Sequence, residues 1–338
     1  PLAHFALAAL ELLDPADTAH ALDVVSVIEA VLDSPRPVLM AQQWEARGEA
    51  VAEMKADGMD YEQRVEALEE VSWPRPLAEL LEAAYESYRS AHPWLPEDAL
   101  EPKSIVRHMW EQALSFTELI SRYKLGRSEG VVLRYLSDAY RTLRQTVPDA
   151  HRSDELDELI EWLGETIRQT DSSLLDEWEA LNDPDRFAHQ SDSVQAGPPP
   201  PRPLTANERA VRTMTRQAMW RRVELAARDD LAGLYAVELA AAALCDPAAP
   251  VVMDRAAWDE ALGSYWAEHD EIGVDADARG PAYLHIEAHP EGGRRWLARQ
   301  TLADPADDHD WVIEAEVDLD ASDAAGELVV LATALRRL

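Results

Sequence analysis

The chain has 338 residues, a length that suffices for two domains of ordinary size, each with its own core. It carries 65 acidic and 31 basic residues, which gives a formal net charge of -34. Because most of such a surface repels phosphate, the composition argues against a free-standing nucleic-acid binder, and any contact with nucleic acid must come from a locally positive patch.

Apolar periodicity and breaker residues predict a series of helices in the first hundred residues. Helices are expected over residues 2–13 and 17–32, with Asp14-Pro15 between them. A further amphipathic helix covers residues 38–57 and stops at Gly58, and Asp60 caps a short charged helix through residue 71. After the Trp-Pro-Arg-Pro run at 73–76, another apolar stripe extends over residues 77–88.

Residues 101–148 are a basic segment in this acidic chain. Apolar residues recur at spacings of three and four over 105–123 and again over 132–147, which predicts two helices. Between them, Gly126 can take a left-handed conformation that ends a helix and Ser128 can cap the next one. We therefore expect a helical hairpin with a basic elbow.

The cations of this hairpin are the predicted nucleic-acid-binding residues. Guanidinium groups hold phosphates and aromatic faces stack bases, a combination that suits a single strand. The open alternative is that the arginines pair with the acidic stretch at 154–179, which has ten acidic residues and a single basic one. The leading candidates are Arg127, Arg134, Arg141 and Arg144, with Lys103, Arg107, Arg122 and Lys124 behind them.

Residues 183–205 are rich in polar residues and then in proline, which predicts a semi-rigid spacer. The expected organisation is a helical domain at 1–185, a linker at 186–206 and a second domain at 207–338. The second domain begins with helices expected over 207–229, 231–245 and 254–271, of which the middle one is almost wholly apolar and should be buried.

Alternation of period two then predicts strands over 283–288, 294–302, 311–319 and 327–335, with turns between them. Helices followed by an antiparallel meander predict a small α+β domain, whose pattern is similar to the SnoaL-like cone fold. Inward-facing Tyr283, His285 and Trp296 could line a pocket in such a cone, and a filled core is the alternative.

No catalytic residue and no metal site is predicted. A Gly-Lys-Ser/Thr loop is missing, and Asp259-Glu260-Ala261-Leu262 falls short of a DEAD box. The His-Asp pairs at 269–270 and 309–310, and the pair at 108 and 111, have too few ligands for a metal. The single cysteine, Cys245, excludes an internal disulfide and predicts a reducing, cytoplasmic setting.

Ser128-Glu129-Gly130, followed by three apolar residues and Arg134, resembles the C-terminal helical domain of DEAD/DEAH-box RNA helicases of the Ski or antiviral type. The wider run, from the first residues to SSLLDEWEAL at 172–181, resembles an actinobacterial branch in which an uncharacterised domain follows the helical one. The resemblance implies a ratchet-like helical bundle that packs on an ATP-driven motor and helps to guide single-stranded RNA.

The same resemblance implies that the parent polypeptide is an ATP hydrolase whose ATP and Mg are bound in a motor core outside this chain. The chain begins at Pro1 inside an apolar pattern, so we expect a piece of something longer. Two other functions stay open: a structural adaptor without RNA contact, and a small-molecule binder or enzyme at 207–338.

Overall fold

The computed structural model describes residues 2–56, 59–170, 203–275, 278–290 and 292–338. The chain divides into two compact units, residues 1–178 and residues 179–338. The first unit is helical and the second combines helices with a four-stranded antiparallel sheet, which confirms the predicted fold class. Nearly all of the predicted linker at 186–206 lies outside the described residues. Across the described residues, none of the helices combines the length and apolar character required to cross a membrane.

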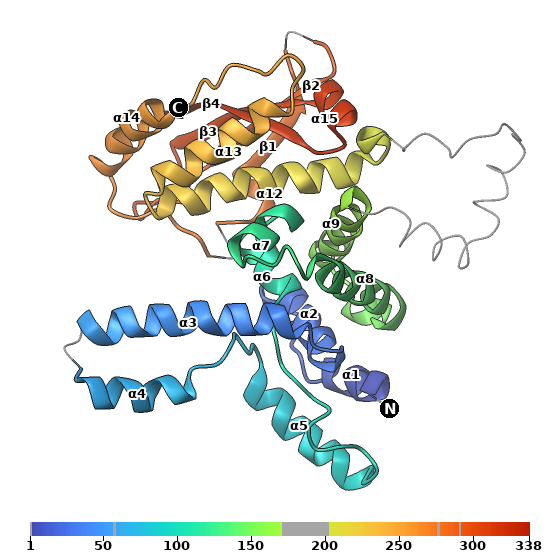
Figure 1. Cartoon of the computed structure of the whole chain (residues 1–338). Helices are drawn as coiled ribbons and strands as arrows, with labels where there is room; N and C mark the ends of the chain where they lie inside the picture. Colours follow the sequence, from blue (N-terminus) through green and yellow to red (C-terminus); the bar gives the residue numbers. More distant parts are fainter. Residues whose placement is uncertain (1, 57–58, 171–202, 276–277, 291) are drawn as a thin grey trace, which may run out of the picture. The chain divides into compact units, whose positions relative to one another are not determined.

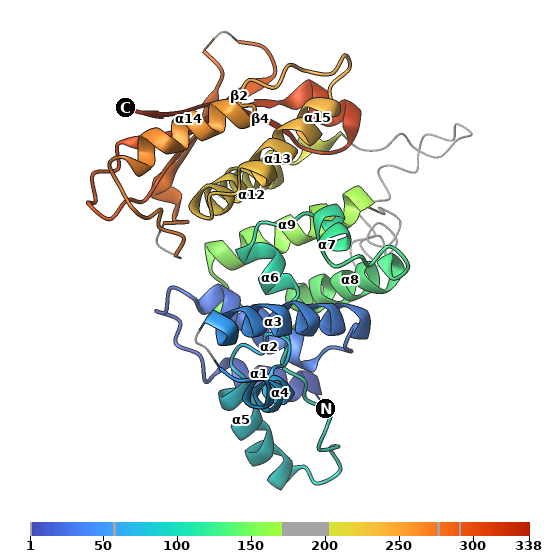
Figure 2. The ribbon, with the colours of Figure 1, turned by 60° about the vertical axis from the view of Figure 1, so that its left-hand side comes forward.

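The first unit is built around α2 (His20–Val31), which is buried along most of its length. It packs against α1, α6, α8 and α9, as Figures 1 and 2 show. The remaining elements are α1 (Leu2–Leu10), α3 (Arg36–Ala56), α4 (Tyr61–Glu70), α5 (Ala78–Ala91), α6 (Val106–Glu111), α7 (Phe116–Arg122), α8 (Glu129–Thr146), a 3₁₀ turn at Asp149–His151 and α9 (Asp154–Thr170).

Helices α8 and α9 pack closely because of one glycine. Each helix buries an apolar face, with Leu136 and Leu143 on α8 and Leu159 and Leu163 on α9 fully covered. A Cβ at Gly164 would lie 2.8 Å from Cε2 of Tyr140. A side chain at this position would force the Tyr140 ring to move, and glycine avoids that shift.

Helices α3 and α4 run side by side as an arm (blue in Figure 1). Asp60 begins α4 with a capping box that includes Gln63, which confirms the predicted cap. Val38 and Leu39 anchor the start of α3 in the core, whereas none of the described side chains of α4 is fully buried.

The basic hairpin differs from the prediction in two ways. Residues 105–123 form two short helices, α6 and α7, because Ala113 adopts a φ of 47° and Ser115 starts a new helix with a capping box to Glu118. The left-handed position expected at Gly126 falls instead on Lys124, with a φ of 54°. The apolar periodicity continues through the break because both short helices bury side chains.

The second unit holds one sheet in the order β1-β2-β3-β4, with all neighbours antiparallel. Helices α12, α13 and α14 pack on the strands (Figure 1). Residues 320–326, predicted as a turn, belong instead to a short helix that starts at Leu319 and ends at Gly326, with a φ of 72°. The elements are α12 (Glu208–Ala227), α13 (Leu231–Ala243), α14 (Arg255–Trp266), β1 (Leu284–Ala288), β2 (Arg295–Thr301), β3 (Trp311–Asp318), α15 (Leu319–Ala325) and β4 (Val329–Arg337), with 3₁₀ turns at Leu204–Ala206 and Pro281–Tyr283.

Two further expectations are corrected. Helix α13 is not buried throughout, since Leu239 on it is 51% exposed; alanine raises the apolar content of a helix without requiring that every face be covered. Thr205, expected in the linker, bonds the Asp323 carboxylate through its backbone N–H (2.9 Å) and its hydroxyl (2.7 Å). The turn at Leu204–Ala206 thus packs on α15 as part of the second unit.

A buried ion pair joins the helical layer to the sheet. Arg222 on α12 and Glu238 on α13 lie 2.7 Å apart with side chains 1% exposed. A second guanidinium nitrogen of Arg222 donates to the Val330 carbonyl, and the other oxygen of Glu238 accepts from the Ala332 N–H, both at 2.8 Å. Each charge therefore has the bonds that burial requires.

Candidate nucleic-acid interface

The inner side of the basic hairpin is organised around a buried carboxylate, that of Glu29 on α2. One of its oxygens accepts the backbone N–H groups of Ile105 (2.8 Å) and Val106 (2.9 Å) and the hydroxyl of Tyr135 (2.8 Å); the other accepts the N–H of Arg107 at 3.2 Å. Burial raises the pKa of Glu29, and these bonds oppose the shift. The carboxylate thus satisfies the free N–H groups at the start of α6.

Lys103 and Arg107 are directed into this interior. The Lys103 side chain is buried, and its ammonium donates to the carbonyls of Leu32 (2.7 Å) and Glu101 (3.1 Å). Burial lowers its pKa to about 8. Arg107 pairs with Asp23 at 2.9 Å and with Glu111 at 2.7 Å. Neither cation is accessible to a phosphate, so both leave the predicted interface.

Arg122 is held by the arm. Its guanidinium lies 2.8 Å from Glu45 on α3, and the Tyr123 hydroxyl donates to the same carboxylate at 2.9 Å. Burial would raise the pKa of Glu45, but the bonds from Arg122 and Tyr123 outweigh it and lower that pKa. His108, considered with Glu111 as a metal pair, instead contacts the Tyr123 hydroxyl at 3.0 Å.

Two cations of α8 are also engaged. Arg144 donates to the Tyr140 hydroxyl at 2.8 Å, and its guanidinium carbon lies 5.6 Å from the centre of that ring. Arg141 lies 3.9 Å from Asp138. Together with Lys103, Arg107 and Arg122, they bring the cations that have a partner within the first unit to five of the eight predicted.

Among the described residues, three predicted cations are exposed and lack a close partner: Lys124, Arg127 and Arg134, which we call the basic elbow. Arg122 and Arg144 are exposed as well, but Glu45 and the Tyr140 hydroxyl hold them. Lys124 and Arg127 are exposed, and within the described part of the chain neither side chain has an ion-pair or hydrogen-bond partner. The Arg134 side chain is 84% exposed, and the nearest carboxylate, that of Asp138, is 4.0 Å away. An exposed pair at that distance contributes little, so all three charges can meet an external anion.

The elbow offers charge without a stacking surface. The nearby rings of Tyr123, Tyr135 and Tyr140 are each less than 10% exposed. The aromatic part of the predicted single-strand site is therefore not present at this position. The basic elbow can therefore bind the phosphates of a nucleic-acid backbone, but within the described residues it has no exposed ring on which a base could stack.

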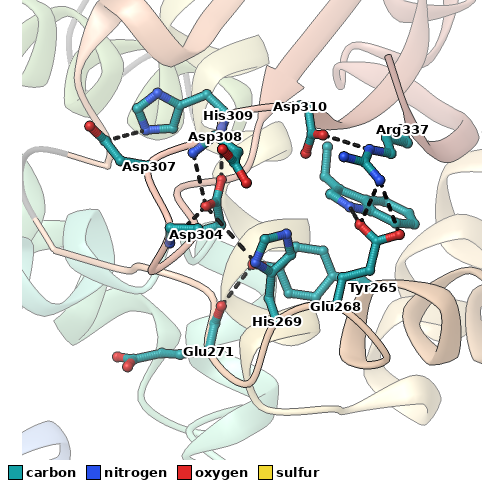
Figure 3. A network of polar contacts seen from close by, with 12 residues as sticks. Tyr265, Glu268, His269, Glu271, Asp304, Asp307, Asp308, His309, Asp310 and Arg337 are labelled. Carbon is teal, nitrogen blue, oxygen red and sulfur yellow. Dashed lines mark hydrogen bonds and ion pairs between the residues drawn. The ribbon is translucent and has the colours of Figure 1, made fainter.

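The His-Asp pairs of the second unit belong to a network that closes a loop (Figure 3). His269 lies 3.9 Å from Asp304, and His309 contacts Tyr283 (3.0 Å) and Asp307 (3.1 Å). Asp304 accepts backbone N–H groups of the loop that follows it. In the described ranges, no group of three or more His, Cys, Asp or Glu side chains could hold a metal ion.

The residues predicted to line a pocket do not gather. Trp296 pairs with Ala288 and His285 with Arg299 in the β1–β2 register, so Trp296 and His285 point to opposite faces of the sheet. Trp296 lies on the helix-covered face, 4.9 Å from the Arg212 guanidinium, whereas the His285 side chain is 68% exposed. Because side chains on opposite faces of a sheet cannot line the same cavity, Trp296 and His285 do not share a pocket.

The main residue that the sequence analysis missed is Glu29. It is the one charged residue in the run Val24–Val31, and an isolated carboxylate in a buried helix requires several donors. That signal was readable. The partners of Glu29 lie 76 or more residues away, so the sequence could not identify them.

Comparisons with known proteins place almost the whole chain in one family. The family model described as Domain of unknown function (DUF3516) matches residues 1–335. Searches of curated proteins and of solved structures found no match.

Proposed function

The chain belongs to the family described as Domain of unknown function (DUF3516), and we propose that it is the accessory C-terminal part of an ATP-dependent RNA helicase. In this function the basic elbow contacts the backbone of single-stranded RNA, and the first unit packs on a motor core outside this chain. ATP and Mg are bound in that core, in the cytoplasm. The resemblance of residues 128–134 and of the wider run to helicase C-terminal domains supports the proposal.

The observation that carries it is the exposure of three cations on a chain of net charge -34. Each phosphate contact on a single strand contributes roughly -0.7 to the slope of log affinity against log salt, so three contacts give a slope of about -2. Such a slope corresponds to a weak, position-holding contact. It suits an accessory surface better than a stand-alone RNA-binding domain.

An exposed apolar surface on the arm is the proposed contact with the motor. Met40 and Trp44 lie one turn apart on α3 and are 68% and 78% exposed. Large apolar side chains at such exposure mark interaction surfaces, and tryptophan is enriched among the residues that dominate binding energy.

The test is fluorescence anisotropy of labelled single-stranded RNA over a salt series. We expect Arg127→Glu with Arg134→Glu to weaken binding about 10-fold or more at low salt and to flatten the salt slope. The matched control is Arg47→Glu with Lys55→Glu, which makes the same charge change on exposed residues of α3. Equal binding by the elbow variant and the control would overturn the RNA contact.

A second candidate is a structural adaptor without RNA contact. It is favoured by the five predicted cations whose charge already has a partner within the first unit. The adaptor predicts no RNA binding at low salt by this chain or by its parent polypeptide. The same titration therefore separates the two functions.

A further inference from the structure

The second unit contains an open hollow of about 750 Å³ that the sequence analysis did not predict. It lies between the segment that follows α13, the end of β3, the first half of β4, and α15. Its volume falls in the range of small-molecule pockets, roughly 300–1,000 Å³. Part of its lining is apolar and includes Leu244, Pro250, Ala324 and Leu331, of which Leu331 lies beside Glu316 in the β3–β4 register.

Another part of the lining is acidic. It carries the carboxylates of Asp246, Glu316, Asp318 and Asp320 against a single guanidinium, that of Arg295. In the β2–β3 register, Arg295 pairs with Asp318, so both project from the face of the sheet opposite Ala298 and Trp296. This acidic part therefore belongs to the face that the Arg212–Trp296 contact leaves uncovered.

Some of this charge is already compensated. Glu316 lies 3.2 Å from Arg295 and 3.3 Å from His289, and Asp320 lies 3.0 Å from Arg294. One oxygen of Asp318 accepts the Ala321 N–H at 2.8 Å. Among the described residues, the other oxygen of Asp318 and the carboxylate of Asp246 have no hydrogen-bond or ion-pair partner.

We propose that this hollow binds a small organic cation, an amine with an apolar body. The ammonium would lie between Asp318 and Asp246 and the hydrocarbon part against Leu244 and Leu331. An opposite charge within about 4–6 Å of a carboxylate is favourable, whereas phosphates and carboxylates would meet uncompensated negative charge. Nucleotides and organic acids are thereby disfavoured as ligands, and the site is independent of the proposed RNA contact.

Cys245 provides a direct readout, because it is the only cysteine of the chain and lies in the wall of the hollow. Burial, with the Asp318 charge as a second cause, raises the pKa of its thiol. The thiol therefore reacts slowly at neutral pH. Labelling is still followed at neutral pH, over a longer time, because a free amine at higher pH would itself consume a maleimide reagent.

The experiment measures the rate at which N-ethylmaleimide modifies Cys245, by intact mass, with hexylamine, hexanol or hexanoate present. We expect hexylamine at about 10 mM or below to slow modification several-fold and the other two to have little effect. Ala324→Lys, which places an ammonium in the hollow, should abolish the protection, and Asp246→Asn should weaken it. RNA binding and helicity should be unchanged in both variants.

Two results would overturn the proposal. One is equal protection by all three probes, which would show an apolar hollow without charge selection. The other is no protection by hexylamine in a chain whose circular dichroism spectrum is native. Since the elbow variants leave the hollow intact, loss of RNA binding and loss of amine binding are separate outcomes.

Discussion

Tyr135 donates its hydroxyl to the buried carboxylate of Glu29 at 2.8 Å, a bond between residues 106 positions apart. It joins α8 to α2 at the point where the same carboxylate also holds the start of α6. The hairpin that carries the basic elbow is thereby fixed to the centre of the first unit from its inner side. Its outer side is left to Lys124, Arg127 and Arg134.

We expect Glu29→Gln to lower the free energy of unfolding by about 2–4 kcal/mol, because the amide nitrogen would meet N–H groups that now donate to a carboxylate oxygen. Tyr135→Phe should cost about 1–2 kcal/mol, and the double variant should cost less than the sum. Urea unfolding measures all three. The control is Glu86→Gln on exposed α5, which should change stability by less than about 0.5 kcal/mol. Strict additivity would contradict direct coupling of the two side chains.

Lys103 gives a prediction about pH. Its pKa is lowered to about 8 in the folded chain, whereas an unfolded lysine titrates near 10.4. Between these values the unfolded state binds more protons, so stability should rise with pH. Relative to Lys103→Met, the native chain should gain about 2 kcal/mol in free energy of unfolding between pH ~8 and pH ~10.

Both chains share all other titrating groups. The difference in their free energy of unfolding therefore reports the titration of Lys103 alone. Lys55→Met is the control, since Lys55 is exposed. Parallel stability curves for the native chain and Lys103→Met over this range would mean that the ammonium is solvated in the folded state.

The sequence predicted elements well where the signal was local. Asp60 and Gln63 are three residues apart, and their capping box is confirmed; the alternating strands were placed to within about two residues, because burial of one sheet face imposes period two. The break at Ala113 was missed although Ser115 and Glu118 have capping-box spacing. Continuous apolar periodicity outweighed that cap signal.

The candidate site was less accessible to sequence reasoning, because the fate of a cation depends on distant partners. Nothing near Arg122 in the chain indicates Glu45, 77 residues away, and Arg107 finds Asp23 at a separation of 84. Arg127 and Lys124 stay exposed because they lie between two helices, where few side chains can reach them. Charge composition located the basic segment, and only the fold separated its inner cations from its outer ones.

Substituting Arg222 alone should lower the stability of the chain far more than substituting Arg222 and Glu238 together. Arg222→Met leaves a carboxylate with 1% exposure unpaired and should cost about 3–5 kcal/mol. Adding Glu238→Leu should recover much of that loss, because two apolar side chains replace two desolvated charges. Thermal unfolding of the whole chain measures the effect. Arg75→Met, which removes a pair with 39% and 51% exposed side chains, should cost only about 1 kcal/mol or less.

Asp304 should make stability sensitive to acid. Burial by itself would raise the pKa of Asp304, but N–H bonds from Asp308, His309 and Ala306 outweigh it and hold that pKa below its ordinary value. A lowered carboxyl pKa contributes stability that is present above the unfolded value and is lost as the pH falls through the folded one. The native chain should therefore lose stability between roughly pH 5 and pH 2 more steeply than Asp304→Asn.

At neutral pH, Asp304→Asn should itself cost about 1–3 kcal/mol, because its NH₂ group would oppose a backbone N–H that now bonds a carboxylate oxygen, at 2.8 Å for His309. Asp307→Asn is the matched control in the same loop (Figure 3), with a side chain 89% exposed. Urea unfolding at three pH values distinguishes the two variants. If Asp307→Asn flattened the acid limb as much as Asp304→Asn, the loop would be held by general charge rather than by the bonds that converge on Asp304.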